Sequence, residues 1–375
     1  MRMRAAVLHT IGAPPPYATS RPLAIEDVEL DAPGDGEVLV RVRAAGLCHS
    51  DLSVVNGDRP RPVPMALGHE AAGEVVEVGR GVVDLKPGDH VVMVFVPSCG
   101  HCLPCMEGRP ALCEPGAAAN GAGTLISGAR RLHLGDKAIN HHMGVSAFAE
   151  HAVVSRNSLV KIDPSLPFDI AALFGCAVLT GVGAVINTAH VEPGSTVAVV
   201  GLGGVGLNSV LAAHAVGATR IVAVDMLDDK LALARQLGAT DAFNARDADC
   251  VAKVRDATNG GVDAAFEMAG SVRAMDLAYR ITRRGGMTIT AGLSHPDHEF
   301  ALKHVSLVAE ERTIKGSYIG GCVSLRDVPR YMALYRQGRL PVERLLTDRL
   351  RLDQINEGFD RLREGKAVRQ IITFD

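Results

Sequence analysis

The sequence is poor in aromatic residues and has no excess of charge of either sign. Tryptophan is absent, and aromatic residues make up 4% of the 375 residues. A surface on which nucleic-acid bases stack is therefore not indicated. Lys and Arg number 39 against 42 Asp and Glu, which gives a net charge of −3, and no basic or acidic run is present. This balance predicts neither nucleic acid nor an anionic membrane as a partner.

No segment has the pattern of a membrane span or of an export signal. The apolar run from Ala5 to Leu8 is too short for the core of a signal peptide. Residues 197–216 have the length of a span, but the glycines in their first half indicate a strand, a turn and a helix. Eight cysteines without a signal peptide predict reduced thiols, and the cytoplasm is the expected compartment.

Four of the cysteines lie close together with the spacing C-x2-C-x2-C-x7-C, namely Cys99, Cys102, Cys105 and Cys113. A loop with this spacing can surround one tetrahedral Zn²⁺ with four thiolates. Because four protein sulfurs complete the coordination, no position remains for a substrate, and this zinc is expected to be structural. The predicted zinc loop covers residues 97–115. Two disulfides, or a C-x-x-C redox pair, remain as alternatives.

The first half of the chain has the pattern of a β-rich domain. Residues 37–43 alternate, with the valines expected to face the core and Leu39 expected outward or half-buried. Residues 73–78 and 90–96 are valine-rich runs bounded by glycine or proline. Short strands with such punctuation predict a small barrel or a partly open sheet. The glycine-rich residues 117–142 show little apolar periodicity and are expected to form a long surface loop.

The pattern changes near residue 177, where short apolar runs begin to alternate with helical stretches. Strands are predicted at residues 196–200, 220–224, 262–266, 287–291 and 313–318, and helices at 205–216 and 228–237. This alternation predicts an α/β fold with a doubly wound parallel sheet and helices on both faces.

The last part of the chain is expected to return to the first domain. A helix is predicted at residues 328–337, and the C-terminal run that begins at Arg369 has the pattern of a strand. The predicted domains are therefore residues 1–177, 178–320 and the returning segment 321–375.

A dinucleotide-binding motif follows the first strand of the second domain. Gly201, Gly203 and Gly206 form G-x-G-x-x-G, and the inner residues Gly204 and Val205 open a helix. The first glycine permits the turn, the second lets the backbone approach a pyrophosphate, and the third lets helix and strand pack closely. The helix N-terminus then favours the negative charge. Glycine-rich packing without a ligand remains as an alternative.

Asp225 ends the next strand, where a carboxylate can accept hydrogen bonds from the adenine ribose and repels a 2′-phosphate. Met226 and Leu227 follow it and offer no cation for such a phosphate, so NAD is predicted rather than NADP. Lys230 is placed either beside the same ribose or on the solvated face of its helix.

Cys48 and His69 lie outside the cysteine-rich loop. Thiolate and imidazole are ligands that zinc accepts. An isolated cysteine or histidine is, however, often part of an ordinary core, and the residues alone do not pair these two.

The complete set of motifs resembles the zinc-dependent medium-chain alcohol dehydrogenase family over essentially the whole chain. It is most similar to the long-loop branch with the liver-type enzymes and the glutathione-dependent formaldehyde dehydrogenases. The resemblance implies a GroES-like β-rich catalytic domain and a Rossmann domain. It is carried by Gly46-Leu47-Cys48-His49-Ser50-Asp51, Gly68-His69-Glu70-Ala-Ala-Gly73, Gly79 and Val82, the cysteine run, Gly175-Cys176 and the dinucleotide motif.

The resemblance assigns a second zinc to Cys48, His69 and Cys176, with a water or an alcohol at the fourth position. Zinc would lower the pKa of that alcohol, and NAD would accept its hydride. The resemblance also implies the remaining roles. Asp51 is expected to orient His69, with a helix cap as the alternative, and Glu70 is expected to approach the metal during ligand exchange. Ser50 is expected to pass on the substrate proton, and His49 and Arg369 are expected to contact the cofactor.

Two positions depart from the family pattern. Ser53 stands where many relatives end the proton relay with a histidine. His49 stands where an arginine often contacts the pyrophosphate, and a mostly neutral imidazole would hold that anion less tightly.

The expected substrate is a small alcohol or aldehyde. Phe95 and Met143 are expected to form an apolar pocket wall, with ordinary core packing as the alternative. Arg59 is expected at the mouth of the pocket, where the glutathione-dependent relatives have an acidic residue, with a solvated loop charge as the alternative. No arginine lies near Ala117. The predicted activity is NAD-dependent oxidation of primary aliphatic or benzylic alcohols, with secondary alcohols not excluded. S-(hydroxymethyl)glutathione oxidation and a non-catalytic NAD-binding relative remain as alternatives. A homodimer that pairs residues 313–318 as edge strands is expected.

Overall fold

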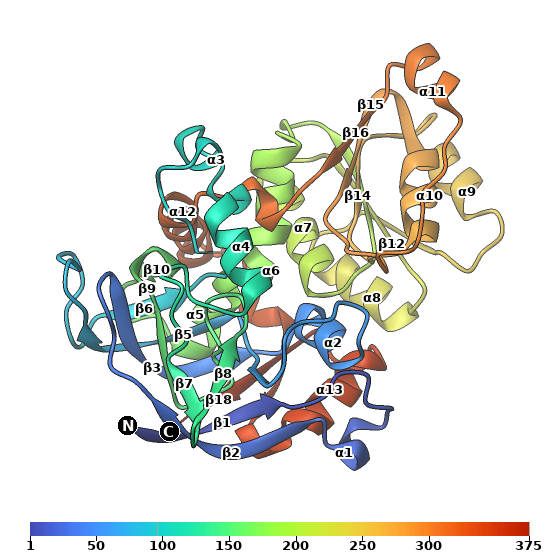
Figure 1. Ribbon diagram of the computed structural model, residues 1–375. Coiled ribbons are helices and arrows are strands. Elements are labelled where there is room, and N and C mark those ends of the chain that lie inside the picture. Colours follow the sequence, from blue (N-terminus) through green and yellow to red (C-terminus); the bar gives the residue numbers. More distant parts are fainter. Residues whose placement is uncertain (96, 375) are drawn as a thin grey trace. The chain divides into compact units, whose positions relative to one another are not determined.

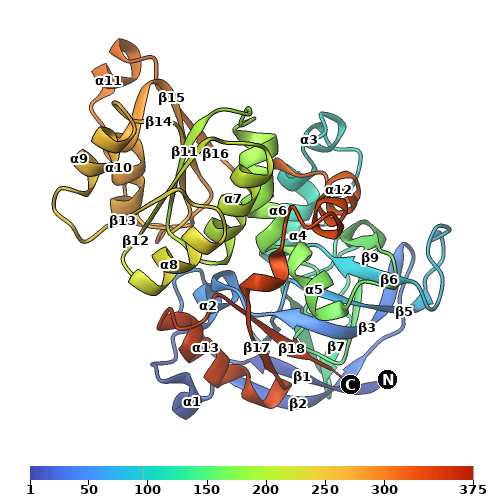
Figure 2. The same cartoon turned by 180° about the vertical axis from the view of Figure 1, so that it is seen from behind.

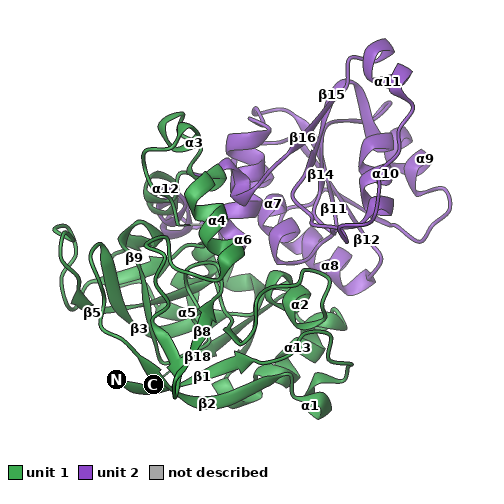
Figure 3. Ribbon diagram, in the orientation of Figure 1, with its two compact units in different colours: residues 1–176, 323–329, 342–375 green, residues 177–322, 330–341 purple. Residues whose placement is uncertain are grey.

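A computed structural model describes residues 1–95 and 97–374 of the chain. The chain divides into two compact units (Figure 3). Unit 1 contains residues 1–176, 323–329 and 342–375, and unit 2 contains residues 177–322 and 330–341. The helix α12 (Ser324–Arg336) therefore begins in unit 1 and ends in unit 2.

Unit 1 contains a small closed barrel. Its apolar core includes Val7, Val28 and Ile139, which are fully buried. Leu39 also belongs to this core at 6% exposure, so the prediction that it points outward or is half-buried was wrong. The barrel strands, in order, are β1 (Arg2–Leu8), β2 (Leu23–Leu30), β7 (Leu132–Leu134), β8 (Lys137–His141) and β4 (Met65–Ala66).

A second sheet of unit 1 is built around its longest strand, β3 (Glu37–Gly46). The C-terminal strand β18 (Arg369–Thr373) pairs antiparallel with β3 and brings Ile371 opposite Gly46. The end of the chain thereby lies in the same sheet as its first half. The other strands are β5 (Ala71–Val78), β6 (His90–Met93), β9 (His151–Ser155), β10 (Leu159–Lys161) and β17 (Leu346–Leu350), and the helices of this unit are α1 (Tyr17–Ser20), α2 (His49–Val55), α3 (Leu103–Met106), α4 (Glu114–Ala122), α5 (Phe168–Ala172) and α13 (Ile355–Arg363).

Unit 2 is a six-stranded parallel sheet with the order β13-β12-β11-β14-β15-β16. This is the strand order of a dinucleotide-binding Rossmann domain, and it confirms the predicted fold class. The strands are β11 (Thr196–Val200), β12 (Arg220–Asp225), β13 (Asp241–Asn244), β14 (Val262–Glu267), β15 (Thr282–Thr290) and β16 (Thr313–Gly316).

Helices cover both faces of this sheet (Figures 1 and 2). α7 (Gly204–Ala215) and α8 (Asp228–Gln236) lie on one face, and α9 (Cys250–Ala257) and α10 (Val272–Ile281) lie on the other. The central strands β11, β12 and β14 are largely buried between them, which explains why their sequences are mainly apolar runs. α6 (Ala177–Gly183) packs against α7, and the short α11 (His304–Ala309) precedes the edge strand β16.

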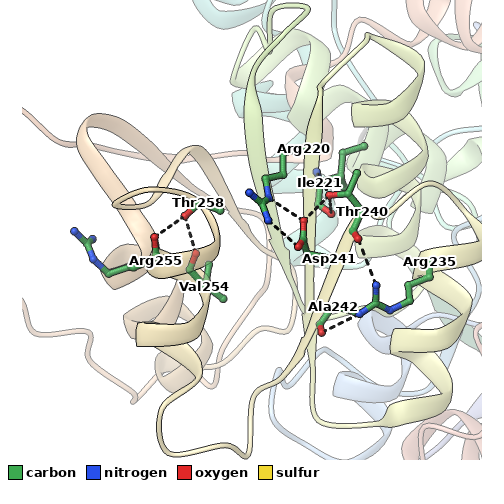
Figure 4. A network of polar contacts seen from close by, with 9 residues as sticks. All are labelled: Arg220, Ile221, Arg235, Thr240, Asp241, Ala242, Val254, Arg255 and Thr258. Carbon is green, nitrogen blue, oxygen red and sulfur yellow. Dashed lines mark hydrogen bonds and ion pairs between the residues drawn. The ribbon is translucent and has the colours of Figure 1, made fainter.

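The edge strand β13 was not predicted, because its four residues are all only half-buried and form no apolar run. Polar side chains attach it to β12 (Figure 4). The guanidinium of Arg220 donates two hydrogen bonds of 2.9 Å to the carboxylate of Asp241. The backbone N–H of Ile221 on β12 donates to the hydroxyl of Thr240 at 3.0 Å. These contacts fix the register of a strand that has little apolar area of its own.

The prediction of a long surface loop at residues 117–142 was wrong. This segment completes α4 and forms β7 and β8. Its elements are too short to show periodicity, and polar contacts with distant residues stabilise them. Asn140, for example, donates to the carbonyl of Pro64 at 2.9 Å, and Arg131 donates to the buried carboxylate of Glu37 at 2.8 Å. The strand predicted at 90–96 ends at Met93, and Val96 lies outside the described residues.

No single helix of the described residues is long and apolar enough to cross a membrane. One bent pair, Phe168–Gly175 with Ala177–Thr188, meets the requirement by length and composition only.

Candidate functional site

Cys48, His69 and Cys176 come from three separate loops of unit 1, and glycines let these loops approach each other. Cys48 follows β3 and is the N-cap residue of α2. His69 follows Gly68, whose φ of +94° favours glycine, and a Cβ there would lie 2.5 Å from the backbone nitrogen of Phe148. Cys176 follows Gly175, where a Cβ would lie 2.5 Å from the carbonyl oxygen of Met93. The motifs therefore specify close backbone approaches.

The three side chains form a buried cluster whose ligand atoms all lie within 4.8 Å of one another. His69 Nε2 is buried and has no hydrogen-bond partner among the described residues. An unpartnered imidazole nitrogen beside two sulfurs is a costly arrangement in a core, but it fits a zinc ion with one further open position. The ring of Phe95 stands edge-on to the ring of His69, with centroids 5.0 Å apart.

The two sulfurs of this cluster influence each other. Their mutual hydrogen bond lowers the pKa of Cys48 well below that of a free thiol and raises that of Cys176, and burial also raises that of Cys176. The thiolate is the form that binds metals, and the lowered pKa of Cys48 favours it.

Asp51 lies behind His69. His69 Nδ1 donates to Asp51 Oδ1 at 3.0 Å, and the backbone N–H of Gly68 donates to the same oxygen at 3.1 Å. Burial would raise the pKa of Asp51, but the neighbouring His69 and His142 lower it below its usual range. The contacts of this carboxylate go to Gly68, His69 and His142, which favours the orienting role over the helix-cap alternative. Because His69 Nδ1 holds the proton, Nε2 is left as the ligand atom.

Glu70 and Arg369 form a buried ion pair beside the same cluster. Burial raises the pKa of Glu70 to about 7, although Arg369 opposes this shift. The structure thus places Arg369 against Glu70. Its contact with the cofactor stays a prediction.

The first turns of α2 carry the remaining relay candidates. His49 is exposed and Ser50 is half-buried. The hydroxyl of Ser53 donates to the carbonyl of Ser50 at 2.8 Å. Ser53 is thereby engaged within its own helix.

The three predicted pocket residues differ in their placement. Phe95 contacts His69 of the cluster edge-on. Met143 is half-buried and has a left-handed φ of 53°, and Arg59 is half-buried with its backbone N–H bound to the carbonyl of Ser53. The roles of Met143 and Arg59 stay predictions.

The cysteine-rich loop forms a second cluster. The four sulfurs lie within 4.8 Å of one another, and all four cysteines are free, so the disulfide alternative is wrong. Backbone N–H groups of Cys102 and Cys99 donate to the sulfurs of Cys99 and Cys113, both at 3.2 Å. A hydrogen bond from the His101 backbone lowers the pKa of Cys99 to about 6. N–H groups directed at sulfur favour thiolates, and four thiolates fit a closed zinc site.

In unit 2, the glycine motif forms the turn between β11 and α7. Gly201 has a φ of +94°, and a Cβ on Gly206 would lie 1.9 Å from the carbonyl oxygen of Gly201. A Cβ on Gly203 would meet no atom within 4 Å. Gly203 is thus not required by packing within the chain, which fits a glycine kept for the approach of a ligand. Gly204 and Val205 are the first residues of α7.

Asp225 ends β12 beside this turn. Its carboxylate accepts hydrogen bonds from the backbone of Leu202 at 2.6 Å and of Leu227 at 3.1 Å. These bonds fix a carboxylate next to the glycine turn. Lys230 lies half-buried in the first turn of α8.

Both units resemble known protein families. The alcohol dehydrogenase GroES-like domain family matches residues 34–164, and the zinc-binding dehydrogenase family matches residues 204–337. An alcohol dehydrogenase zinc-binding domain protein from Burkholderia ambifaria is 36% identical, with a TM-score of 0.94 over 100% of this chain and 99% of that one. The chain belongs to the zinc-dependent medium-chain alcohol dehydrogenase family.

Two further family members resemble it over the full length of both chains. Benzyl alcohol dehydrogenase from Acinetobacter calcoaceticus is 32% identical, with a TM-score of 0.93 and 100% of each chain covered. A zinc-binding dehydrogenase from Sinorhizobium meliloti 1021, solved bound to NADP, is 26% identical, with a TM-score of 0.80 and 100% of each chain covered.

One site residue of this dehydrogenase escaped the sequence analysis. His142 is 1% exposed and lies with Asp51 and His69 in a third group of potential ligands. It directly precedes Met143, but no motif or spacing connects it with Asp51. Burial lowers the pKa of His142 and thereby favours the neutral ring.

Removing one thiolate of the cysteine-rich loop is expected to damage stability more than chemistry. In a Cys105→Ala variant, zinc content falls by one ion per chain and the melting temperature falls, because zinc-binding free energy contributes directly to folding. Metal analysis and calorimetry check this. Unchanged zinc content would show that the four sulfurs are not a metal site.

Proposed function

We propose that this protein oxidises alcohols reversibly to aldehydes or ketones, with zinc at Cys48, His69 and Cys176 and NAD as hydride acceptor. The observation that carries the proposal is the buried set of two sulfurs and the unpartnered Nε2 of His69. Three protein ligands leave one coordination position for a substrate oxygen, whereas four sulfurs in the other cluster leave none. The catalytic metal is therefore assigned to the first cluster.

When bound, zinc supplies Lewis acidity that lowers the pKa of an alcohol, and NAD supplies the two-electron oxidant. The protein keeps the ligand atoms in place. Asp51 accepts a hydrogen bond from the Nδ1–H of His69 and so fixes the orientation of the ring. The hydroxyl of Ser50 is the proposed first acceptor of the substrate proton. Ser53 stands where many relatives have the relay histidine, so the onward path does not use a histidine at that position. The hydroxyl of Ser53 donates instead to the carbonyl of Ser50.

NAD is proposed over NADP, although one relative was solved with NADP. The support is Asp225, whose carboxylate is fixed next to the glycine turn by two backbone N–H groups. A negative charge there disfavours a 2′-phosphate. The residues that follow, Met226 and Leu227, provide no opposing cation.

Aromatic and aliphatic primary alcohols are the proposed substrates, and secondary alcohols are the next class to test. Phe95 next to His69 provides an apolar surface at the metal. The similarity to a benzyl alcohol dehydrogenase supports a benzylic substrate. Substrate orientation would come from the metal, and affinity from apolar contact.

The proposed assembly is a homodimer formed through the edge strand β16. On α11, which precedes this strand, Val305 is 67% exposed and Val308 is 70% exposed. An exposed edge and exposed apolar side chains both favour association. Sedimentation analysis distinguishes this dimer from a monomer or a tetramer.

A spectrophotometric screen tests the function. Primary aliphatic, benzylic and secondary alcohols are offered with NAD or NADP, each with and without glutathione, and reduced cofactor is followed at its absorbance band. We expect benzyl alcohol to be oxidised with NAD in the absence of glutathione. Strict dependence on glutathione would instead assign the S-(hydroxymethyl)glutathione reaction, and no turnover by zinc-loaded protein would indicate a non-catalytic relative.

A His49→Arg variant is expected to bind NADH more tightly and to release it more slowly than the wild type. A permanent positive charge holds a pyrophosphate better than a mostly neutral imidazole. Stopped-flow displacement of NADH measures the rate, and His49→Gln serves as the uncharged control. Equal dissociation rates for wild type and His49→Arg would contradict the assignment of His49 to the cofactor.

A further inference from the structure

His142 lies in a turn that directs it against Asp51. The carbonyl of His142 accepts hydrogen bonds from the backbone N–H groups of Val145 at 3.0 Å and Ser146 at 3.2 Å, and its own N–H donates to the hydroxyl of Ser146 at 2.9 Å. Met143 and Ser146 both have left-handed φ values, of 53° and 54°. Such backbone is costly for residues other than glycine and persists only where the surrounding structure enforces it.

The ring of His142 meets both members of the pair that orients the metal ligand. Its Nδ1 lies 3.1 Å from Asp51 Oδ1, and its centroid lies 5.6 Å from that of His69 with the planes at 84°. Nδ1 of His142 makes no hydrogen bond among the described residues, so this close electrostatic contact is weaker than the hydrogen bond from His69. One carboxylate oxygen is thus approached by two imidazoles and one backbone N–H.

This convergence leaves the other carboxylate oxygen, Asp51 Oδ2, buried and without a hydrogen-bond partner among the described residues. A carboxylate that is held at one oxygen only can still turn about its side-chain bond. Each donor at Oδ1 restricts that rotation, and the direction of Oδ1 sets the direction of the His69 ring. His142 therefore acts on the metal site through Asp51.

We propose that His142 is a positioning residue for the catalytic metal, in which its imidazole fixes Asp51 and thereby the orientation of His69. The inference rests on the proposed function, in which His69 binds zinc. Partners behind a metal ligand of this kind affect metal affinity or activity by about 10–100-fold. His142 does not touch the substrate or the metal in this role.

Two substitutions separate positioning from packing. His142→Phe keeps an aromatic ring and removes the nitrogen, whereas His142→Asn loses the ring but keeps an N–H donor close to the position of Nδ1. We expect His142→Phe to weaken zinc binding at the catalytic site by about 10-fold and to lower kcat by a similar factor. We expect His142→Asn to recover both to well within the roughly 10-fold loss of His142→Phe.

Zinc affinity is measured by chelator competition, and kcat and KM are measured separately with benzyl alcohol. Cobalt replacing zinc gives a second readout, because its visible bands report ligand geometry, and these bands should shift in His142→Phe only. The neighbouring His141 is the matched control. It is also buried, but its Nε2 accepts the backbone N–H of Arg131 at 3.0 Å, so His141→Phe should leave zinc affinity unchanged even where stability falls.

Unchanged zinc affinity and kcat in His142→Phe would overturn the inference. Equal losses in the Phe and Asn variants that follow their melting temperatures would also overturn it, because they would show packing alone. If the wild type binds zinc only at the four cysteines, the proposed function itself fails. That outcome is recognised from metal analysis of the wild type alone.

Discussion

A Cys176→Ala variant is expected to lose one zinc per chain and to lose more than about 10³-fold in kcat/KM. Removing a single hydrogen-bond donor to a transition state costs about 10²–10³-fold. Losing a metal ion that acidifies the substrate raises the reaction barrier further than that. The cluster of Cys48, His69 and Cys176 has three protein ligands, and two cannot retain zinc against its competitors in solution.

The matched control is Cys250→Ala, which truncates a buried cysteine in the core of unit 2 that belongs to neither cysteine cluster. It should keep two zinc ions and near-normal turnover. Together with Cys105→Ala, these variants distinguish the two metal sites. Cys176→Ala should lose catalytic activity with little change in melting temperature, whereas Cys105→Ala should lose stability. Full activity of Cys176→Ala with one zinc per chain would place the chemistry elsewhere.

The parts of the site that the sequence predicts are those encoded by short local patterns. The glycine turn follows a strand and opens a helix, so the sequence by itself supplies a physical reason for each of Gly201, Gly203 and Gly206. The structure has a left-handed turn at Gly201 and close packing at Gly206, and it leaves open space at Gly203. The cysteine loop is equally local. Its four sulfurs come together within a single loop of the chain.

The parts that were missed depend on contacts between distant segments. The ion pair between Glu70 and Arg369 forms only because the C-terminal strand pairs with β3. A turn after β8 brings His142 next to Asp51, and no periodicity or spacing in the sequence predicts such a turn. The prediction for residues 117–142 was wrong for a related reason, because polar contacts to Glu37 and Pro64 stabilise the short strands of this segment. Local pattern predicts the elements, and tertiary pairing decides which side chains meet.

Alanine at Gly203 and alanine at Gly206 are expected to affect different properties, the first cofactor binding and the second folding stability. Gly206→Ala should destabilise unit 2 by about 3 kcal/mol or more, at the upper end of the cost of overpacking. Its Cβ would lie 1.9 Å from the carbonyl oxygen of Gly201, and that backbone belongs to the turn itself and cannot move aside. The gain in helix propensity of about 1 kcal/mol does not offset this clash.

Gly203→Ala should instead fold normally and bind NADH more weakly. The residue has φ −74° and ψ −171°, which alanine adopts without strain, and a Cβ there meets no atom of the chain within 4 Å. In the proposed complex, however, the Cβ occupies space that the pyrophosphate needs. A repulsion of about 1–3 kcal/mol corresponds to a roughly 5–150-fold higher Kd. Thermal melts and NADH fluorescence titrations of both variants measure the two effects. A Gly203→Ala variant that binds NADH as tightly as the wild type would show that the dinucleotide does not pass over this turn.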